Sequence, residues 1–458
     1  MRRHTLTIAL ITGLSALAGS ASAADLAQIY EMARASDPQL AAAESAMYAA
    51  GEGVVQARSS LLPNLSGTVS LGDSNRSSSS VGPFRLDDGS VGFVRGESGG
   101  DSTTRSYRLQ LTQTIYSQAN YTRLRGARAG ESSLAASYDA ALDNLIVRVA
   151  EAYFGALTAT TNLEAAKAEE TAVQRQLDQA QQRFEVGLSA ITDVHEAQAR
   201  FDGARAAAIL AQNQLDDSYE ALAELTGKLV SDVRPLADDI KLSRPSPDQT
   251  EDWVATAEAE SPLLAIRRFE LKQAEESVNT ARAAHLPTLS ANYSWTNENG
   301  WGSSNSNDFV FPASSSFRNH GFGITLNVPI FEGFATQSRV RQESYNRDAA
   351  ADRYEQEKRA VTRSTRNAFR AVAAGISEVE ARKQAQISAQ SALDATQAGF
   401  EVGTRTIVDV LISQQVLFQA QRDYARARHD YLLNSLRLKQ AAGTITVADL
   451  QAVNALLK

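Results

Sequence analysis

The 458-residue chain contains no cysteine and only 10 prolines, and aromatic residues make up 7% of it. The absence of cysteine excludes disulfides, thiolate metal sites and a lipid anchor on an N-terminal cysteine. Acidic residues outnumber basic ones by 53 to 45, and the net charge of −8 argues against nucleic-acid binding, which requires a basic surface. Few prolines and aromatics beside abundant alanine indicate a mostly helical protein rather than a compact enzyme with a thick core.

The chain also lacks the residue spacings that carry enzymatic or metal chemistry. Its histidines are scattered and show no H-E-x-x-H or other metal-binding spacing; they are His4, His195, His285, His320 and His429. No glycine-rich phosphate loop precedes a Lys-Ser or Lys-Thr pair, and there is no nucleophile elbow. We therefore expect no enzyme, no cofactor and no metal, so energy for any transport has to come from a partner protein.

Residues 1–23 have the layout of a secretory signal peptide. Arg2 and Arg3 form a basic start, an apolar stretch follows, and Ala21-Ser22-Ala23 fits an A-x-A cleavage site. The apolar stretch is too short to span a bilayer as a retained helix, and no later segment approaches 18 consecutive apolar residues. The protein is therefore expected to leave the cytoplasm, either as a soluble exported protein or as an outer-membrane β-barrel.

The remainder of the chain is an internal duplication, with a first repeat at 24–248 and a second at 249–458. Three landmarks recur in the same order, two at an offset of 224 residues and one at 216. They pair 36–40 with 260–264, 62–66 with 286–290 and 183–188 with 399–404. Each repeat is predicted to contain a helix, a strand, a loop, a second strand and a long helix that reverses at a tight turn into another helix, before an equatorial segment.

Four stretches alternate apolar and polar residues with the period of two that β-strands show. They lie at about 64–72, 105–116, 288–297 and 321–331. Strands of ~9–11 residues with one apolar face fit a membrane barrel with a wet lumen, and on periodicity alone they fit a half-buried soluble sheet equally well. The segments between them, at 72–104 and 297–320, are polar and are predicted to be long loops. Such loops favour the extracellular side of an outer-membrane barrel, since they would be unusual inside a compact soluble domain.

Long helices are predicted at about 117–226 and 333–442, each interrupted by one tight turn. From Leu134 to Phe184, apolar residues recur with the 3.5-residue period of a coiled coil, and no proline interrupts them. Many positions of this seam are alanine, which lets helices approach closely but buries little area. These helices should therefore need several partners.

The number of predicted strands limits the assembly. Four strands are too few for a closed barrel, because the smallest membrane barrels have about eight. An open sheet edge cannot lie in lipid, where unpaired backbone groups cost several kcal/mol each. Membrane strands would therefore require oligomerisation. Two chains would leave too little lumen for transport, whereas three chains would give a barrel of about twelve strands.

The sequence resembles the TolC family of outer-membrane efflux channels over essentially the whole mature chain. The most telling segments are 183–194 (RFEVGLSAITDV), 388–398 (SAQSALDATQA), 402–411 (VGTRTIVDVL) and 425–442 (ARARHDYLLNSLRLKQAA). The resemblance implies a mixed α/β membrane protein that is predominantly α. A homotrimeric, twelve-stranded outer-membrane barrel, with four strands per chain, would continue into a periplasmic α-helical coiled-coil barrel.

The resemblance also implies partners and a role. The chain would be the exit duct of a tripartite export system, docked to a periplasmic membrane-fusion adaptor and to an inner-membrane pump of the RND, ABC or MFS type. Small-molecule efflux and type I protein secretion both remain open as its use. The competing class is a soluble periplasmic coiled-coil adaptor, but an adaptor would not show two copies of strand–loop–strand.

The same resemblance places a periplasmic gate where the long helices reverse. Arg405 matches the family's gate arginine, Asp193 and Gln176 match partners in its closing network, and Asp409 matches a ring of carboxylates at the constriction. The expected adaptor contacts are the two turns Val186-Gly187-Leu188 and Val402-Gly403-Thr404. Glycine suits such reversals because it adopts positive φ. For Asp193 and Asp409 a simple capping role at a helix N-terminus stays open.

Two positions depart from the family pattern. Phe400 stands where the family's gate has a tyrosine, so one hydroxyl contact is missing and the closed state should be held less tightly. Ile412 replaces a second aspartate one helical turn after Asp409. A constriction with one carboxylate ring instead of two should show weaker cation selectivity and weaker block by multivalent cations.

Overall fold

The computed structural model describes residues 24–230, 232–306 and 309–458, so the predicted signal peptide lies outside the described residues. Within these ranges, no helix combines the length and apolarity needed to cross a membrane. The chain divides into two units, each built from both halves of the sequence. Of the described residues, the helical unit comprises 24–42, 140–230, 232–261 and 360–458, and the sheet unit comprises 43–139, 262–306 and 309–359.

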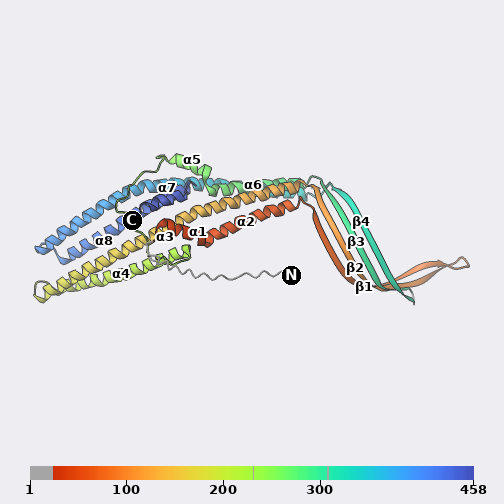
Figure 1. Ribbon diagram of the computed structural model, residues 1–458, viewed down its shortest axis with the longest axis horizontal. Coiled ribbons are helices and arrows are strands. Elements are labelled where there is room, and N and C mark those ends of the chain that lie inside the picture. The colour runs from red at the N-terminus through yellow and green to blue at the C-terminus, as the bar shows by residue number, and fades with distance from the viewer. Residues whose placement is uncertain (1–23, 231, 307–308) are drawn as a thin grey trace, which may run out of the picture. The chain divides into compact units, whose positions relative to one another are not determined.

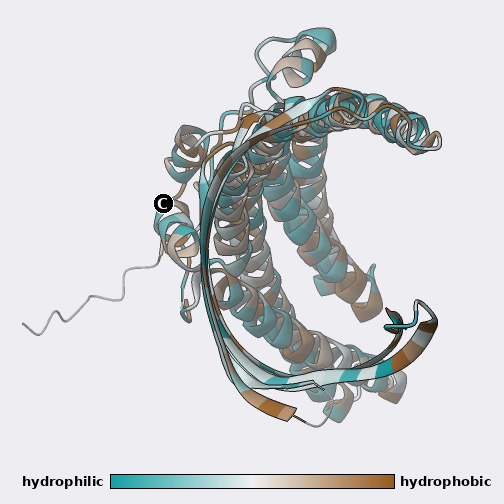
Figure 2. Ribbon diagram, turned by 90° about the vertical axis from the view of Figure 1, so that its right-hand side faces the viewer, coloured by the Kyte–Doolittle hydropathy of each residue, from teal (hydrophilic) through white to brown (hydrophobic). Residues whose placement is uncertain are grey.

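The sheet unit contains one four-stranded antiparallel sheet in the order β1-β2-β3-β4 (Figure 1). Its strands are β1 (Asn64–Arg85), β2 (Val91–Tyr116), β3 (Thr288–Ser306) and β4 (Phe309–Asn327). Leu65 lies opposite Leu111, and Val69 lies opposite Tyr107, so the apolar residues of neighbouring strands share one face. Leu65 and Val69 are about 70% exposed in the single chain. Figure 2 shows that the sheet is curved, and its edge strands β1 and β4 have no partner on their outer side in the described chain.

The strands are longer than their sequence pattern predicts, and this corrects the two predicted loops. Most of 72–104 and 297–320 belongs to strands, and the β1–β2 connection is only the short turn around Gly89, which has a φ of 85°. Serine and glycine are weak strand formers, but here the ladder to the neighbouring strand continues through them. Cross-strand polar pairs support it: the hydroxyls of Ser70 and Ser106 lie 2.7 Å apart, and Thr103 donates to Asp73 at 3.1 Å.

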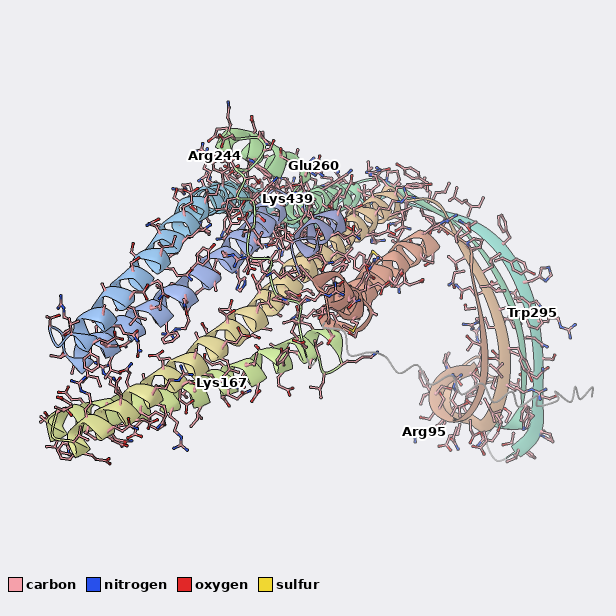
Figure 3. All side chains as sticks on the ribbon, turned by 60° about the vertical axis from the view of Figure 1, so that its left-hand side comes forward. Arg95, Lys167, Arg244, Glu260, Trp295 and Lys439 are labelled. Carbon is pink, nitrogen blue, oxygen red and sulfur yellow. The ribbon has the colours of Figure 1, made fainter. Side chains whose placement is uncertain are left out.

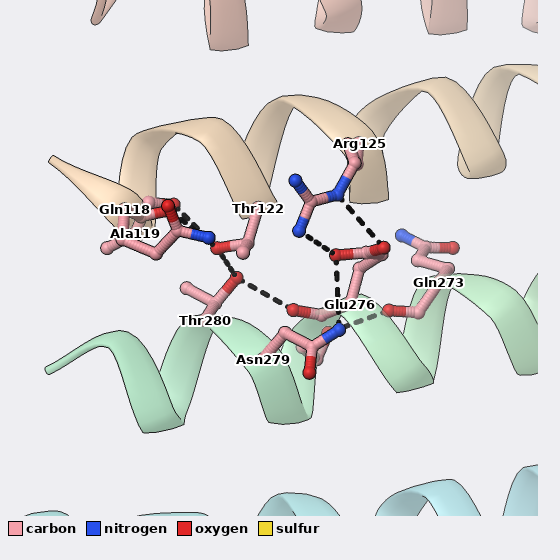
Figure 4. A network of polar contacts seen from close by, with 9 residues as sticks. Gln118, Ala119, Thr122, Arg125, Gln273, Glu276, Asn279 and Thr280 are labelled. Atoms are coloured by element: carbon pink, nitrogen blue, oxygen red, sulfur yellow. Dashed lines mark hydrogen bonds and ion pairs between the residues drawn. The ribbon is translucent and has the colours of Figure 1, made fainter.

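Two equivalent helices of the sheet unit reflect the duplication. α2 (Pro38–Ser59) and α6 (Pro262–Ala283) both begin with proline, which suits the first position of a helix because its missing N–H is not needed there. α6 packs against the start of α3 (Gln118–Glu185), as Figure 4 shows. Arg125 donates to Glu276 at 3.0 Å, and Thr280 donates to Thr122 at 2.7 Å.

The helical unit is built around two helical hairpins, one from each repeat. The first is α3 with α4 (Ile191–Thr226), and the second is α7 (Ala335–Glu401) with α8 (Ile407–Ala441). α3 and α7 have 68 and 67 residues, which makes each about 100 Å long at 1.5 Å per residue. Lys167, labelled in Figure 3, lies on α3 in the first hairpin. It donates to Gln212 of α4 at 3.4 Å.

Three shorter helices, α1 (Leu26–Ser36), α5 (Thr250–Glu260) and α9 (Val447–Asn454), complete the helical unit. Its most deeply buried side chains include Tyr30, Tyr153 and Leu436. The landmark aspartate Asp37 receives two hydrogen bonds from Arg148, at 2.5 and 3.3 Å, and one from the backbone N–H of Leu40. Burial alone would raise the pKa of Asp37, but these donors hold it below its ordinary value. The first repeated landmark thus includes a structural ion pair.

Candidate gate at the helical tip

The helical tip is defined here as the turns at residues 186–190 and 402–406, together with the helix ends that they join. Gly187 and Gly403 have φ values of 74° and 81°, a region that residues with a Cβ rarely adopt. In each turn the chain bonds back to the helix it leaves: Leu188 N donates to Arg183 O at 2.7 Å, and Thr404 N donates to Gly399 O at 2.8 Å. The two repeats therefore end their long helices in the same way, with glycine required by the backbone.

The outer surface of these turns is apolar and uncovered in the single chain. Val186, Leu188 and Val402 are 68%, 70% and 75% exposed, and Thr404 is exposed beside them. Gly187 and Gly403 have open space where a Cβ would lie. The predicted adaptor-contact residues are thus accessible, in two turns of matching geometry.

Behind the turns, one hydrophobic cluster draws residues from all four helices of the two hairpins. The buried members are Val173, Leu177 and Ala180 of α3, Ala197 of α4, Ala389, Leu393 and Phe400 of α7, and Ile407, Val410, Leu411 and Leu417 of α8. A shared cluster couples the hairpins, because separating them would expose apolar surface from both. Several members are alanine, so the area at stake per turn is small.

Phe400 takes part in a contact between the hairpins that the sequence pattern did not predict. The guanidinium carbon of Arg183, in the last turn of α3, lies 5.0 Å from the centroid of the Phe400 ring. A cation over an aromatic face is attracted by the ring quadrupole. Arg183 therefore contacts the residue where the family resemblance leads one to expect a tyrosine hydroxyl. No signal in the sequence marks this contact, since the two residues lie more than two hundred positions apart.

The structure does not bring Arg405 and Asp193 together within one chain. In the part of the chain that the structure describes, neither side chain takes part in an ion pair or side-chain hydrogen bond. Asp193 lies in the first turn of α4, whose N-cap residue Ala190 offers no capping side chain. Arg405 lies against Gly399, where a Cβ would come within 2.8 Å of its Cγ. Neither charge is thus held in an ion pair within the described chain.

Asp409 has a defined local role. Its Oδ2 accepts from the N–H and the hydroxyl of Thr406, both at 2.9 Å, while its own N–H donates back to that hydroxyl at 3.2 Å. This capping box starts α8. The hydrogen bonds from Thr406, and to a smaller extent the charge of Arg405, lower the pKa of Asp409. Capping, left open at both aspartates, is therefore observed at Asp409, whereas Asp193 makes no such box.

Gln176 is almost fully buried at 9% exposure, and its Oε1 has no hydrogen-bond partner in the described chain. Gln414 on α8 is similar, with 7% exposure and an unpaired Oε1. A buried carbonyl oxygen without a donor is costly. The helical tip of a single chain therefore leaves charges and acceptors unsatisfied.

The comparisons with known proteins place this architecture in a family. Residues 29–228 and 253–444 match the family of outer membrane efflux proteins. The chain is 37% identical to outer membrane protein TolC of Vibrio cholerae, covering 100% of this chain and 99% of that protein. It is 35% identical to TolC of Escherichia coli, covering 99% and 89% respectively. The chain belongs to the outer membrane efflux protein family.

This outer membrane efflux protein also shares its fold with solved channels. The crystal structure of CusC has a TM-score of 0.73 at 17% identity, covering 92% of both chains, and Campylobacter jejuni CmeC has 0.71 at 18%, covering 94% and 90%. The prediction of a mostly helical, duplicated chain with four strands is confirmed. The predicted class, an outer-membrane channel for efflux or secretion, is confirmed by the family, and the adaptor alternative is not supported.

Proposed function

We propose that three copies of this efflux protein form an exit duct that is closed at the helical tip and opened by partner proteins. The main support is that Arg405 and Asp193, at the helical tip of one chain, form no ion pair among the described residues. In addition, Gln176 has a buried oxygen without a hydrogen-bond donor. Neighbouring copies can pair with the charges of Arg405 and Asp193, since a three-fold arrangement repeats both of them around one axis.

The sheet supports the same stoichiometry. β1 and β4 are edge strands, and lipid does not tolerate an edge, so β4 of one copy would pair with β1 of the next. Strands of 19 to 26 residues are long enough to cross a bilayer, which needs about 9–11. Three copies would supply about twelve strands, enough for a lumen, with the helical hairpins gathered into one periplasmic tube.

The proposed gate has modest energetics. Exposed ion pairs typically contribute about 0.2–1 kcal/mol, so one Arg405–Asp193 pair at each of the chain interfaces would bias the tip towards closure without locking it. Docking of an adaptor could therefore open it. Asp409, kept charged by Thr406, would supply the one carboxylate ring at the constriction, with Ile412 in place of a second.

Partners and cargo follow from the same surfaces and relatives. The exposed turns around Gly187 and Gly403 would contact a periplasmic membrane-fusion adaptor, which joins the duct to an inner-membrane pump of the RND, ABC or MFS type. The pump would supply the energy, and the duct itself would need no enzymatic activity, cofactor or metal. The family is that of outer membrane efflux proteins, and one relative, 29% identical over 93% of this chain, is the alkaline protease secretion protein AprF of Pseudomonas aeruginosa. Efflux and type I protein secretion are therefore both supported as uses.

Because the chain has no cysteine, engineered cysteines test the assembly directly. A variant chain that carries one cysteine on β1 and one on β4 should form covalent trimers in outer membranes. A control chain that carries both cysteines on β2 should not. A product that stops at dimers, or monomers only, would contradict the trimer.

The gate is tested by conductance in planar bilayers. Arg405→Ser should raise the resting conductance of the purified trimer, because it removes the proposed contact to the neighbouring copy. Arg359→Ser is the matched control, since Arg359 pairs with Glu355 on the surface of α7. Equal conductance of wild type and Arg405→Ser would overturn the gate assignment. Drug susceptibility of a strain that lacks only this protein then separates a general efflux outlet from a dedicated secretion channel.

A further inference from the structure

Polar contacts join the first hairpin to the second along α3 and α8. Going towards the helical tip, they pair Glu151 with Arg437, Thr158 with His429 and Glu169 with Arg422. The last of these is the nearest to the tip: Arg422 Nη1 donates to Glu169 Oε2 at 3.2 Å. Beyond it, the hairpins share the hydrophobic cluster, the Arg183–Phe400 contact and a hydrogen bond that Arg200 of α4 donates to Gln415 of α8 at 3.2 Å. Among the described residues, Glu169 and Arg422 therefore form the ion pair between α3 and α8 that lies nearest to the helical tip.

This ion pair is better protected than the other ion pair between α3 and α8. The side chains of Arg422 and Glu169 are 22% and 17% exposed, whereas those of Arg437 and Glu151 are 47% and 41% exposed. Partial burial reduces screening by salt and strengthens the attraction between the charges. Arg422 is also oriented from its own helix, because its Nη2 donates to Gln419 at 2.9 Å.

The side chains around the Glu169–Arg422 pair are loosely packed. A cavity of about 630 Å³ lies between α3, α4 and α8, and Glu169 and Arg422 are among its lining residues. Much of its wall consists of small residues such as Ala166, Gly203 and Ala207. Small side chains across a gap form few dispersion contacts, so apolar packing contributes little to holding the hairpins together here. Polar contacts therefore supply much of the attraction between the hairpins beside this cavity: the Glu169–Arg422 ion pair, and the hydrogen bond from Arg200 to Gln415.

We infer that Glu169 and Arg422 are positioning residues of the gate: they form a clasp that holds the two hairpins together and must loosen before the helical tip opens fully. This inference rests on the proposed gating of the duct. Between Ile407, where α8 begins, and Arg422 lie about four helical turns, roughly 22 Å, and this is the arm of α8 that moves while the clasp stays closed. The clasp is separate from the Arg405 and Asp193 contacts, which link neighbouring copies.

Conductance of charge variants tests the clasp. Glu169→Gln and Arg422→Gln should each raise the open probability of the trimer in bilayers by about fivefold, which corresponds to roughly 1 kcal/mol. The exchanged pair, Glu169→Arg with Arg422→Glu, should return it towards the wild-type value. Arg426→Gln is the matched control, because Arg426 is on the same helix and its side chain is 73% exposed.

A covalent version gives the opposite expectation. Cysteines at positions 169 and 422, joined by a short bismaleimide, should prevent the helical tip from opening fully and lower the conductance of a channel that also carries Arg405→Ser. Thermal unfolding of every variant is measured in parallel to identify effects on stability. The exchanged pair should restore conductance even where its melting temperature stays below that of wild type.

The outcomes distinguish failure of the clasp from failure of the proposed gate. If Arg405→Ser opens the channel but both clasp variants conduct like wild type, or the exchanged pair stays as open as the single variants, the clasp is wrong and the gate stands. If Arg405→Ser also has no effect, the gating proposal itself fails.

Discussion

Arg183, at the end of α3, stacks over Phe400, at the end of α7, with 5.0 Å between the guanidinium carbon and the ring centroid. This contact links the first hairpin to the second at the point where the family resemblance leads one to expect a tyrosine hydroxyl. Phe400 is only 9% exposed, so the ring is also part of the hydrophobic cluster behind the turns. The helical tip thus has a connection between the hairpins through a ring face.

Replacing Arg183 should weaken closure. Arg183→Gln loses the cation–π attraction, which is typically about 0.5–1 kcal/mol at exposed sites, so resting conductance in bilayers should rise severalfold. Phe400→Tyr keeps the ring and adds a hydroxyl, so its conductance should equal or fall below that of wild type. Arg175→Gln, an exposed position on the same helix, is the control. A conductance of Arg183→Gln equal to that of the control would contradict a role for the stacked arginine.

The proposed constriction should respond to changes at Asp409, its proposed carboxylate ring. Asp409→Asn should abolish most block by multivalent cations, while Ile412→Asp, at a position 45% exposed and one turn further along α8, should strengthen block by adding a second ring. Similar block in wild type and Asp409→Asn would show that this assignment is wrong. A neutral amide at position 409 accepts the capping hydrogen bonds less strongly than a carboxylate, so a melting curve should accompany each conductance measurement.

The pH dependence of this selectivity follows from the lowered pKa of Asp409. Hydrogen bonds from Thr406 hold that pKa below 3.8, the ordinary pKa of an aspartate. The Asp409 carboxylate therefore stays mostly charged at a pH where an ordinary aspartate is half protonated. Cation selectivity from Asp409 should therefore persist at about pH 4 and be lost only as the pH falls through the lowered pKa. Thr406→Val removes the hydroxyl donor and should move this loss of selectivity to higher pH. Reversal potentials in a salt gradient measure both effects.

His429 predicts a separate, acid-dependent loss of stability. Its ring is buried, stacks on Phe154 and bonds through Nδ1 with the Thr158 hydroxyl at 2.8 Å. Burial, with the nearby charge of Arg428, lowers the pKa of His429 to about 4. An unfolded histidine binds a proton near pH 6.5, so the folded state should lose stability between pH 6.5 and about 4, by up to roughly 3 kcal/mol per chain.

The measurement is thermal unfolding of wild type and His429→Gln across this pH range. The variant cannot gain the proton, so its melting temperature should fall less steeply between pH 6.5 and about 4, even if it is lower at neutral pH. Parallel curves for the two proteins would show that His429 does not titrate on unfolding.

What the sequence could predict here depends on how local each feature is. The reversal at Gly403 and the capping role of Asp409 are encoded within a few residues, since Thr406 and Asp409 have the spacing of a capping box. The existence of the strands follows from alternation, but their length does not. Ser77 to Ser80 belong to β1 because β2 pairs with them, and such pairing over distance outweighs local preference.

The contacts between the repeats were beyond sequence reasoning for the same reason. Glu169 and Arg422, like Arg183 and Phe400, lie more than two hundred residues apart, and each is an ordinary helix residue in its own neighbourhood. Only the packing of one hairpin on the other selects them. The duplication shows which segments correspond, but it does not give the rotation of each helix about its axis.

Gly399 offers a last test, because it gives Arg405 its place at the tip. A Cβ at residue 399 would come within 2.8 Å of Arg405 Cγ, close to the root of that side chain, so Gly399→Ala should displace Arg405. Alanine favours a helix over glycine by up to about 1 kcal/mol, so thermal stability should not fall. Resting conductance should nevertheless rise towards that of Arg405→Ser. Gly375→Ala is the matched control on α7, since its nearest neighbour would lie at an ordinary 3.6 Å, and equal conductance of the two alanine variants would show that Gly399 does not position Arg405.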